Sequence, residues 1–204
     1  MFKRIFDIIM SSLGLICLLP MFLIIGILIR FESNGPFFYR GIRTGQFGRA
    51  FQIYKFRTMI SNAEKVGGPS TALNDQRITR IGKYLRKYKI DELPQLINIL
   101  IGDMSFVGPR PQVERYTRLY TEEERVILTV KPGLTDYASI RFINLDAILG
   151  DDNVDDKYLR EIEPEKNKLR ILYAKNPSFW TDMKILFSTF VQIFRIPSLW
   201  NTKN

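Results

Sequence analysis

The first strong pattern in the chain is an apolar run close to its N-terminus. From Ile8 to Ile29 the sequence carries no charged residue, and such a run spans the apolar core of a bilayer as a helix that rises about 1.5 Å per residue. Pro20 falls inside the run, where proline removes a backbone hydrogen bond and clashes with the preceding turn. The pattern predicts a membrane helix with a kink or break at Pro20.

Basic residues flank this run on both sides. Lys3 and Arg4 precede it, and Arg30 and Arg40 follow it, whereas spanning helices usually carry their excess of Lys and Arg on one side. We therefore expect a re-entrant helix that breaks at Pro20 and returns both ends to the cytosolic face. The alternative is an ordinary spanning anchor with the catalytic domain inside the cell. A cleaved signal peptide fits less well, because no small-residue cleavage site follows the run.

Asp7 lies at the edge of the apolar run. In a helix it is one turn from Lys3 and Arg4, and pairing with them would lower the cost of placing a carboxylate near lipid. The alternative is a carboxylate that is simply solvated at the headgroups.

After the anchor, residues 36–58 contain two aromatic-rich runs separated by Gly41, Gly45 and Gly48. This pattern predicts a β-hairpin with a long loop. Lys55 and Arg57 stand two residues apart and would share one face of the second strand, where they could meet a phosphate. A solvated strand face explains the same pattern.

A polar stretch at 61–75 predicts a loop, which could serve as a lid. A basic amphipathic helix follows, with Ile81, Leu85 and Tyr88 among its apolar positions. That helix leads directly into the adjacent acids Asp91 and Glu92.

The stretch from Leu93 to Gln112 begins with Pro94, and proline suits the first turn of a helix. Asp91 and Glu92 therefore lie at or just before a helix N-terminus, where backbone N–H groups favour negative charge and phosphate alike. One acid would be enough for capping. The second acid, and the nearby Arg86 and Arg110, need another explanation.

Two later stretches carry weaker patterns. Phe179–Trp200 is apolar and aromatic but too polar to span, so it is either an interfacial helix or a core helix of the globular domain. The acidic residues between 151 and 156 lack the glycine and closing glutamate of a calcium loop, and a solvated loop is expected there.

Composition limits the chemistry further. The 204 residues carry 30 Lys and Arg against 21 Asp and Glu, a net charge of +9, which indicates an anionic partner. The chain contains no histidine and one cysteine, Cys17, so Ser/His/Asp catalysis, His-ligated zinc and disulfides within the chain are excluded. Carboxylates must therefore carry most acid, base or nucleophilic work, and a cytosolic setting fits.

Several stretches together resemble the bacterial sugar transferases, the monotopic polyprenyl-phosphate phosphoglycosyl transferases. They are FKRIFDI before the proline-containing run, FQIYKFRTM, DQRITRIGKYLRK, IDELPQLINILIGDMSFVGPRPQ and KPGLT. The resemblance implies that an aspartate attacks the β-phosphate of a nucleotide diphosphate sugar, typically a UDP-sugar, and releases UMP. A polyprenyl phosphate, undecaprenyl phosphate in most bacteria, then takes the phosphosugar from the enzyme.

Residue by residue, the resemblance makes Asp91 the nucleophile and Glu92 the neighbour that helps it to hold Mg²⁺. Both chemistries agree with the residues present, because a carboxylate nucleophile needs no histidine and Mg²⁺ prefers oxygen ligands. Pro20 matches the break of the re-entrant helix. The further substrate-binding candidates are Arg86, Arg110, Lys55, Arg57, Gln95, Lys131 and Arg141.

The implied fold is α+β and mainly helical. A re-entrant helix at 1–31 and a small β-hairpin are joined by amphipathic interfacial helices around a cytosolic catalytic domain at 32–204, on the bacterial inner membrane. The chain departs from the family pattern at Leu19, where a serine usually precedes the proline, and over Asp136–Phe142, where a glycine and a small-aromatic-glutamine-valine run usually follow KPGLT.

Two other classes of function explain part of the sequence. A catalytically silent membrane adaptor would use the basic face to bind anionic lipid or recruit glycosyltransferases, but lipid binding needs neither Asp91 nor Glu92. Nucleic-acid binding would follow from a pI near 9.7, but it leaves the apolar anchor unexplained and no recognition motif appears. We expect no nucleic-acid partner.

Overall fold

The structure is a computed structural model that describes residues 2–61, 63, 75–143 and 158–199. Within that part the chain is mainly helical, with a two-stranded antiparallel sheet and a second pair of very short parallel strands. The α+β prediction is confirmed at this level. Most of the expected loop at 61–75 and the acidic run at 151–156 lie outside the described residues.

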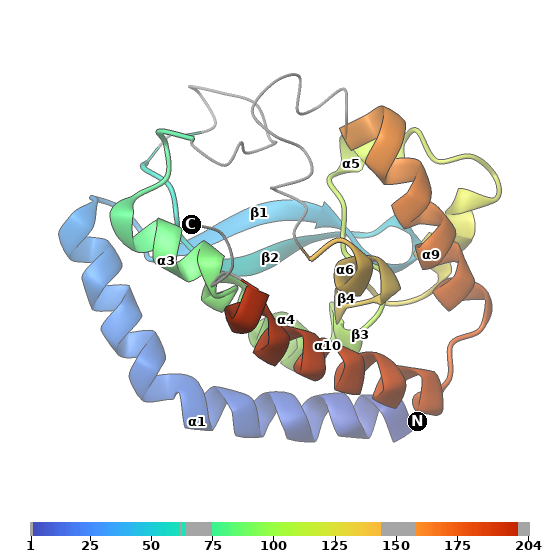
Figure 1. Ribbon diagram of the computed structural model, residues 1–204, viewed down its shortest axis with the longest axis horizontal. Helices are drawn as coiled ribbons and strands as arrows, with labels where there is room; N and C mark the ends of the chain where they lie inside the picture. Colours follow the sequence, from blue (N-terminus) through green and yellow to red (C-terminus); the bar gives the residue numbers. More distant parts are fainter. Residues whose placement is uncertain (1, 62, 64–74, 144–157, 200–204) are drawn as a thin grey trace.

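One long helix, α1 (Phe2–Glu32), contains the whole apolar run and continues through Pro20. It changes direction near its middle (Figure 1), as expected of a helix that loses a backbone hydrogen bond to proline. It is long and apolar enough to cross a membrane, by length and composition, and is the one such helix among the described residues. Its inner face buries Phe22, Ile25 and Ile29.

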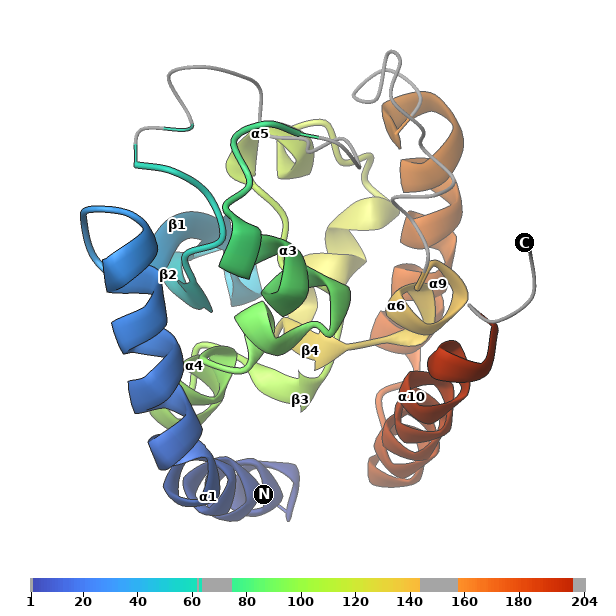
Figure 2. The same cartoon turned by 60° about the vertical axis from the view of Figure 1, so that its left-hand side comes forward.

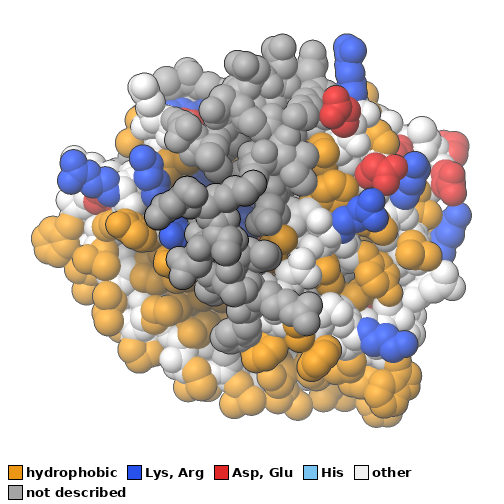
Figure 3. Space-filling view, viewed as in Figure 1, with side chains coloured by type: hydrophobic (Ala, Val, Ile, Leu, Met, Phe, Trp, Pro, Cys, Tyr) orange, Lys and Arg blue, Asp and Glu red, His pale blue; other side chains and the backbone are white. Residues whose placement is uncertain are grey.

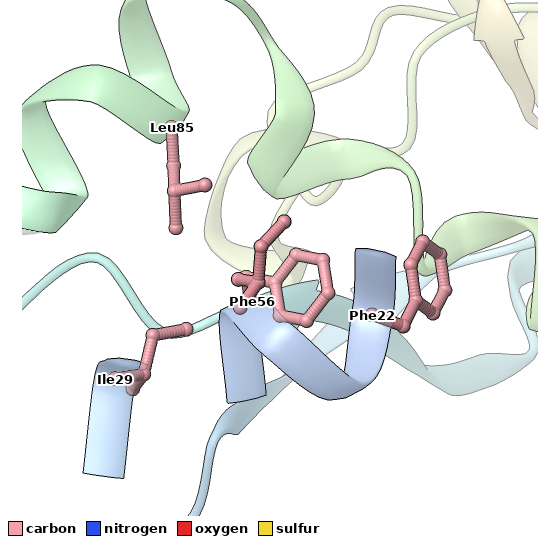
Figure 4. Packing of buried hydrophobic residues seen from close by; sticks show 5 residues of the cluster. Phe22, Ile29, Phe56 and Leu85 are labelled. Atoms are coloured by element: carbon pink, nitrogen blue, oxygen red, sulfur yellow. The ribbon is translucent and has the colours of Figure 1, made fainter. Parts of the chain in front are cut away.

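The predicted hairpin is confirmed, but its loop is shorter than predicted, because Gly41 lies within the first strand. Strands β1 (Phe38–Thr44) and β2 (Ala50–Phe56) pair antiparallel and are joined through a 3-10 turn at Gln46–Gly48. Ile53 and Phe56 of β2 are buried, and the Phe56 ring packs edge-on against Phe22 of α1 at 5.1 Å. Figure 4 shows how Ile29 and Leu85 close this cluster. The hairpin is thereby fixed to the C-terminal half of α1.

Helices α3 (Arg80–Lys87) and α4 (Gln95–Ile101) are joined by a 3-10 turn, η2 (Ile90–Glu92). The Thr79 hydroxyl caps α3 by accepting from the Gly82 N–H at 3.0 Å. α4 begins directly after Pro94, as predicted, but ends at Ile101 because Gly102 takes the left-handed conformation with φ 101°.

The chain beyond Gly102 forms a feature that the sequence analysis did not predict. Strand β3 (Ser105–Val107) pairs in parallel with β4 (Gly133–Thr135). Immediately after β3, the backbones of Gly108 and Gly133 approach so closely that a Cβ on Gly133 would lie 2.1 Å from the Gly108 nitrogen. Both glycines are therefore needed for this contact.

The C-terminal part is built from short turns and two helices. α9 (Glu163–Lys175) packs against a 3-10 helix, η3 (Glu124–Thr129), and against α6 (Tyr137–Arg141). α10 (Phe179–Leu199) contacts β3, β4 and α6. The remaining elements are α5 (Glu114–Thr117) and a π-helical turn, η4 (Tyr158–Ile162), that leads into α9.

α10 is a core helix on one face, as one of the two interpretations of this stretch expects, and its other face is exposed and apolar. Asp182 and Ile185 on one face are buried, whereas Phe187 and Phe190 on another are exposed. Apolar side chains gather along the lower edge of the molecule over α1 and α10 (Figure 3). Figure 2 shows α1 and α10 on opposite sides of this edge, with α3, α4, β3 and β4 between them.

The two ends of α1 contact the same folded body. At the N-terminal end, Lys3 pairs with Asp182 of α10 at 2.5 Å, and Arg4 donates to the carbonyl oxygens of Ile99 and Leu100 at the end of α4. At the C-terminal end, the Glu32 carboxylate accepts from the backbone N–H groups of Arg80 and Ile81. Polar contacts therefore hold α1 at both ends.

Asp7 makes different contacts from those expected. It is buried, and its Oδ1 accepts from the Ser105 hydroxyl at 3.1 Å and from the Phe106 N–H at 3.2 Å. The basic residues of the first turn are used elsewhere, since Lys3 pairs with Asp182 and Arg4 caps α4. Asp7 thus fixes β3 against the N-terminal half of α1.

The approach of Gly108 to Gly133 generates a prediction about stability. A Gly133→Ala change places a methyl group against backbone, which cannot move aside as a flexible side chain can, so we expect a loss of about 3 kcal/mol or more and a Tm more than ~6 °C lower. Thermal unfolding of the detergent-solubilised protein, followed by tryptophan fluorescence, measures this change.

Gly48→Ala is the matched control. A Cβ on Gly48 meets no atom within 4 Å, so this variant tests only the cost of a left-handed alanine, about 1–2 kcal/mol. Equal Tm losses in the two variants would contradict the close backbone contact.

Candidate active site

The adjacent acids lie in the turn between α3 and α4. Lys89 takes the left-handed conformation with φ 56° just before the turn, and the backbone N–H of Lys89 donates to the Arg86 carbonyl. Pro94 then fixes the start of α4. This local geometry sends Glu92 toward the hairpin and the loop after β3, as its contacts with Lys55 and Arg110 show.

The Glu92 carboxylate is held by two cations. Its Oε1 accepts from Lys55 of β2 at 2.8 Å, and its Oε2 accepts from the Arg110 guanidinium at 2.8 Å. A second guanidinium nitrogen of Arg110 also donates to Oε1, so the Arg110 pair is bidentate. The Glu92 side chain is only 15% exposed, and such charge-assisted bonds are strong where water is scarce.

Asp91 is adjacent to Glu92 in the chain but forms no ion pair with Lys55 or Arg110. The residue is 7% exposed, and its Oδ1 is buried with no hydrogen-bond partner among the described residues. Buried polar atoms are nearly always paired, and an exception calls for an explanation. An unpaired carboxylate oxygen next to fixed cations is suited to attack or to bind an incoming group.

The two acids have opposite electrostatic environments. Burial raises the pKa of Asp91, and the charge of Glu92 acts in the same direction, while Lys55 and Arg86 oppose them. Burial also disfavours the ionised form of Glu92, but the charges of Arg110 and Lys55 outweigh it and hold the pKa of Glu92 well below its usual range. Glu92 is therefore a permanent anion, and Asp91 is the acid of the pair that takes up a proton more readily.

The cations respond to the same environment. Burial lowers the pKa of Lys55, although the neighbouring Glu92 partly offsets that effect. Glu92 also raises the pKa of Arg110 above its ordinary value. The pKa values of the two cations are therefore shifted in opposite directions.

Asp136 positions Arg110 and was missed as a functional candidate. Its Oδ2 accepts from the Arg110 backbone N–H at 3.2 Å, and its Oδ1 caps α6 by accepting from the Ser139 N–H at 2.6 Å. The signal in the sequence was the departure at Asp136–Phe142, where an Asp precedes a short helix, as N-caps commonly do.

The remaining sequence candidates are placed in different surroundings. Arg86 donates to the Thr58 hydroxyl at 2.9 Å, and its charge favours the ionised form of Asp91. Arg57 uses its guanidinium to hold the connection after α1, by donating to the carbonyl oxygens of Ser33 and Asn34. Its described contacts are thus structural.

Gln95 is fully buried at the start of α4, and neither atom of its side-chain amide has a partner among the described residues. Lys131 lies toward the other end of α4, where burial and the charge of Arg4 lower its pKa. Arg141 is exposed and stands over the ring of Phe142. The structure therefore gathers five candidates around one point: Lys55, Arg86, Asp91, Glu92 and Arg110.

The carboxylate pair can be tested as a magnesium site. No group of three or more His, Cys, Asp or Glu side chains that could hold a metal occurs among the described residues. Mg²⁺, however, usually takes one or two carboxylates together with substrate phosphates. The Asp91 Oδ1, which has no partner among the described residues, fits the role of a magnesium ligand. Glu92 is next to Asp91 in the chain, and its two oxygens already accept from Lys55 and Arg110.

Comparisons with known proteins match nearly the whole chain. The family model described as bacterial sugar transferase matches residues 1–196. UDP-glucose:undecaprenyl-phosphate glucose-1-phosphate transferase of Klebsiella pneumoniae is 37% identical over 193 residues, which cover 92% of this chain and 39% of the relative. An uncharacterized sugar transferase of Bacillus subtilis, EpsL, is 37% identical over 187 residues, which cover 92% of this chain and 84% of the relative.

A third relative acts on another sugar by its name. UDP-N-acetylgalactosamine-undecaprenyl-phosphate N-acetylgalactosaminephosphotransferase of Aeromonas hydrophila is 36% identical over 192 residues, which cover 92% of this chain and 42% of the relative. The chain therefore spans about two fifths of the length of the Klebsiella and Aeromonas relatives.

The environment of the acids generates a prediction about titration. We expect Asp91 to titrate above the ordinary aspartate pKa of about 3.9, because burial disfavours its ionised form. Lys55→Met removes a cation that favours ionisation and should raise the pKa of Asp91 further. Glu92→Gln removes a repelling charge and should lower it. Carboxyl ¹³C NMR titration of each variant, with the Asp91→Asn spectrum to identify the signal, measures these shifts.

Shifts in the reverse directions would contradict this electrostatic description. Glu114→Gln is the matched control for loss of a carboxylate, because Glu114 forms an exposed pair with Arg118 and should leave the pKa of Asp91 unchanged.

Proposed function

The chain belongs to the bacterial sugar transferase family, and we propose that it transfers a phosphosugar from a UDP-sugar to undecaprenyl phosphate. The observation that carries the proposal is the buried carboxylate oxygen of Asp91, which has no hydrogen-bond partner in the described part of the chain, beside a Glu92 that is held ionised by Lys55 and Arg110. The names of the Klebsiella and Aeromonas relatives support both substrate classes. Because those two relatives differ in their sugar, the sugar of this chain is left open.

Asp91 is the nucleophile of the proposed reaction. Its carboxylate oxygen forms a bond to the β-phosphorus of the donor while the bond from that phosphorus to the bridging oxygen breaks, and UMP leaves with the electron pair. The phosphosugar is then bound to Asp91 as an acyl phosphate. An oxygen of the polyprenyl phosphate next attacks the same phosphorus, and Asp91 departs as a carboxylate. Such covalent catalysis divides one difficult displacement into two easier ones.

The neighbouring groups serve the phosphoryl transfer by position and charge. Arg110 and Lys55 place positive charge beside Asp91, where negative charge spreads over the phosphoryl oxygens. Glu92 holds both cations in place. Because it is ionised, it also offsets part of their positive charge until the substrate binds. Asp91 and Glu92 would hold Mg²⁺ together with the substrate phosphates, and the ion would supply further positive charge against them.

The contacts of α1 support a location at the cytosolic face of the inner membrane. The apolar outer face of α1 would enter one leaflet, and α10 would lie along the interface with Phe187 and Phe190 toward lipid. Lys3 and Glu32, at the two ends of α1, both bind elements of one folded body. A re-entrant path satisfies these contacts, because both ends of α1 must then lie on the same side.

The released nucleotide tests the reaction type. Detergent-solubilised protein with Mg²⁺, undecaprenyl phosphate and a panel of UDP-sugars should release UMP from at least one sugar. Asp91→Asn removes the nucleophile and should lower the rate by at least ~1,000-fold, with thermal unfolding used to show that the variant is folded.

Release of UDP would contradict phosphosugar transfer and indicate ordinary glycosyl transfer. Failure to release nucleotide from any sugar would favour the silent-adaptor alternative. Asp103→Asn is a control in the same fold, because Asp103 follows α4 and contacts Asn98 rather than the acidic pair.

The path of α1 is tested by labelling. In a Cys17→Ser background, single cysteines are introduced at Phe2 and at Asn34. Both should react with a reagent that does not cross the membrane when it is added to inverted vesicles, and neither should react when it is added to right-side-out vesicles. Reaction of the two positions from opposite sides would show a spanning helix and leave the chemistry of Asp91 untouched.

A further inference from the structure

One lysine outside the candidate active site is buried and forms no ion pair with any described residue. Lys166 of α9 is 7% exposed, and its ammonium makes no hydrogen bond or salt bridge among the described residues. Instead the ammonium lies over two aromatic rings, 5.0 Å from the centre of Tyr158 and 5.6 Å from the centre of Phe142. Lysine is rarely buried to this degree unless it is paired.

Two sets of contacts connect this ammonium with the segment that carries Arg110. Phe142 ends α6, and the Asp136 cap of that helix also accepts from the Arg110 backbone N–H. On the other side, the Tyr158 hydroxyl lies 3.1 Å from the Gln112 amide, two residues beyond Arg110. The two rings that flank Lys166 therefore belong to segments that contact the loop carrying Arg110.

The charges around Lys166 are also mainly unfavourable to it. Burial lowers its pKa to about 8, and Arg170 and Arg110 act in the same direction, while Glu163 and Asp136 oppose them. Glu163 is itself paired with Arg170 at 2.8 Å, and Asp136 accepts from two backbone N–H groups. The nearby acids are thus already occupied.

A purely structural role does not account for the charge. Contact with the two rings recovers only part of the free energy that is lost when an ammonium is removed from water. A methionine would fill the same space between the rings at no such cost. A largely buried lysine that has no anionic partner among the described residues, and that is close enough to Arg110 for their charges to interact, fits an anionic ligand that is bound during turnover.

We propose that Lys166 is a phosphate-binding residue, which together with Arg110 holds a phosphate group of a substrate beside Asp91. The assignment rests on the proposed function, because that function supplies the phosphate, from either the diphosphate of the nucleotide sugar or the headgroup of the polyprenyl phosphate. The Phe142 and Tyr158 rings hold the ammonium by cation–π contacts.

Binding measurements on the solubilised full-length chain test the assignment. UDP and farnesyl phosphate are titrated separately into wild type, Lys166→Met and Lys166→Gln by isothermal calorimetry. We expect each neutral variant to bind at least one probe about tenfold more weakly, as a lost charge-assisted contact predicts. Loss for UDP assigns the donor diphosphate, loss for farnesyl phosphate assigns the acceptor headgroup, and loss for both assigns a phosphate position that the two substrates share.

Two charged-residue variants serve as controls. Lys166→Arg keeps the positive charge and should bind within about threefold of wild type, since a guanidinium also contacts phosphate and aromatic rings. Lys168→Met removes a lysine of the same helix whose side chain is 73% exposed and paired with Glu165, and it should bind both probes as wild type does.

The proposal is overturned if folded Lys166→Met and Lys166→Gln, as judged by Tm, bind both probes as tightly as wild type, or if wild type binds neither probe. UMP release by the wild-type enzyme is measured in parallel. Unchanged binding by the neutral variants alongside active wild type would refute only the role of Lys166, whereas inactive wild type would refute the proposed function itself.

Discussion

The double ion pair of Glu92 holds together three segments that are distant in sequence. Lys55 comes from the hairpin, Glu92 from the turn between α3 and α4, and Arg110 from the loop after β3. Removing water from these charges is costly, and a buried pair is repaid only when its geometry leaves few atoms unsatisfied. Glu92 meets that condition with hydrogen bonds to both of its oxygens. The position of Asp91 depends on this arrangement, because the two acids are adjacent in the chain.

Two neighbouring carboxylates acquire different roles from their surroundings alone. Glu92 is ionised and held by its cations, whereas Asp91 keeps a buried oxygen that has no hydrogen-bond partner among the described residues. In the proposed mechanism the nucleophile must be oriented and yet free to form a new bond, and a carboxylate whose two oxygens are already held does not meet both conditions. This division between the two acids would explain why the chain has a pair where a single helix cap would be enough.

The long apolar helix α1 is also part of the scaffold of the site. Asp7 of α1 fixes β3, and the loop that follows β3 carries Arg110. Arg4 satisfies carbonyl groups at the end of α4, the helix that begins just after Asp91 and Glu92. The polar residues before the apolar run are therefore contacts between α1 and the site, in addition to any role at the headgroups. A shift of α1 would therefore displace the segments that carry Asp91 and Arg110.

Local patterns were sufficient for the elements that depend on local physics. The apolar run, the glycine-separated hairpin and the start of α4 after Pro94 follow from hydrophobicity and from backbone preferences. The pairing of β3 with β4 joins strands too short to show a period, and it depends on the contact between Gly108 and Gly133. The roles of Asp136 and Lys166 depend on neighbours that only the fold brings together. Arg57 shows that a local pattern can also mislead. Its spacing from Lys55 suggested that the two side chains share one face of a strand, but the Arg57 guanidinium donates to the carbonyl oxygens of Ser33 and Asn34.

In the proposed mechanism Asp91 carries the phosphosugar between two half-reactions. Intact mass spectrometry of the protein, incubated with Mg²⁺ and its UDP-sugar but without a polyprenyl phosphate, tests this step. We expect a mass increase of one phosphosugar that maps to Asp91, is absent in Asp91→Asn, and disappears when undecaprenyl phosphate is added. Turnover of the complete mixture without any adduct in its absence, or an adduct that persists in Asp91→Asn, would contradict it.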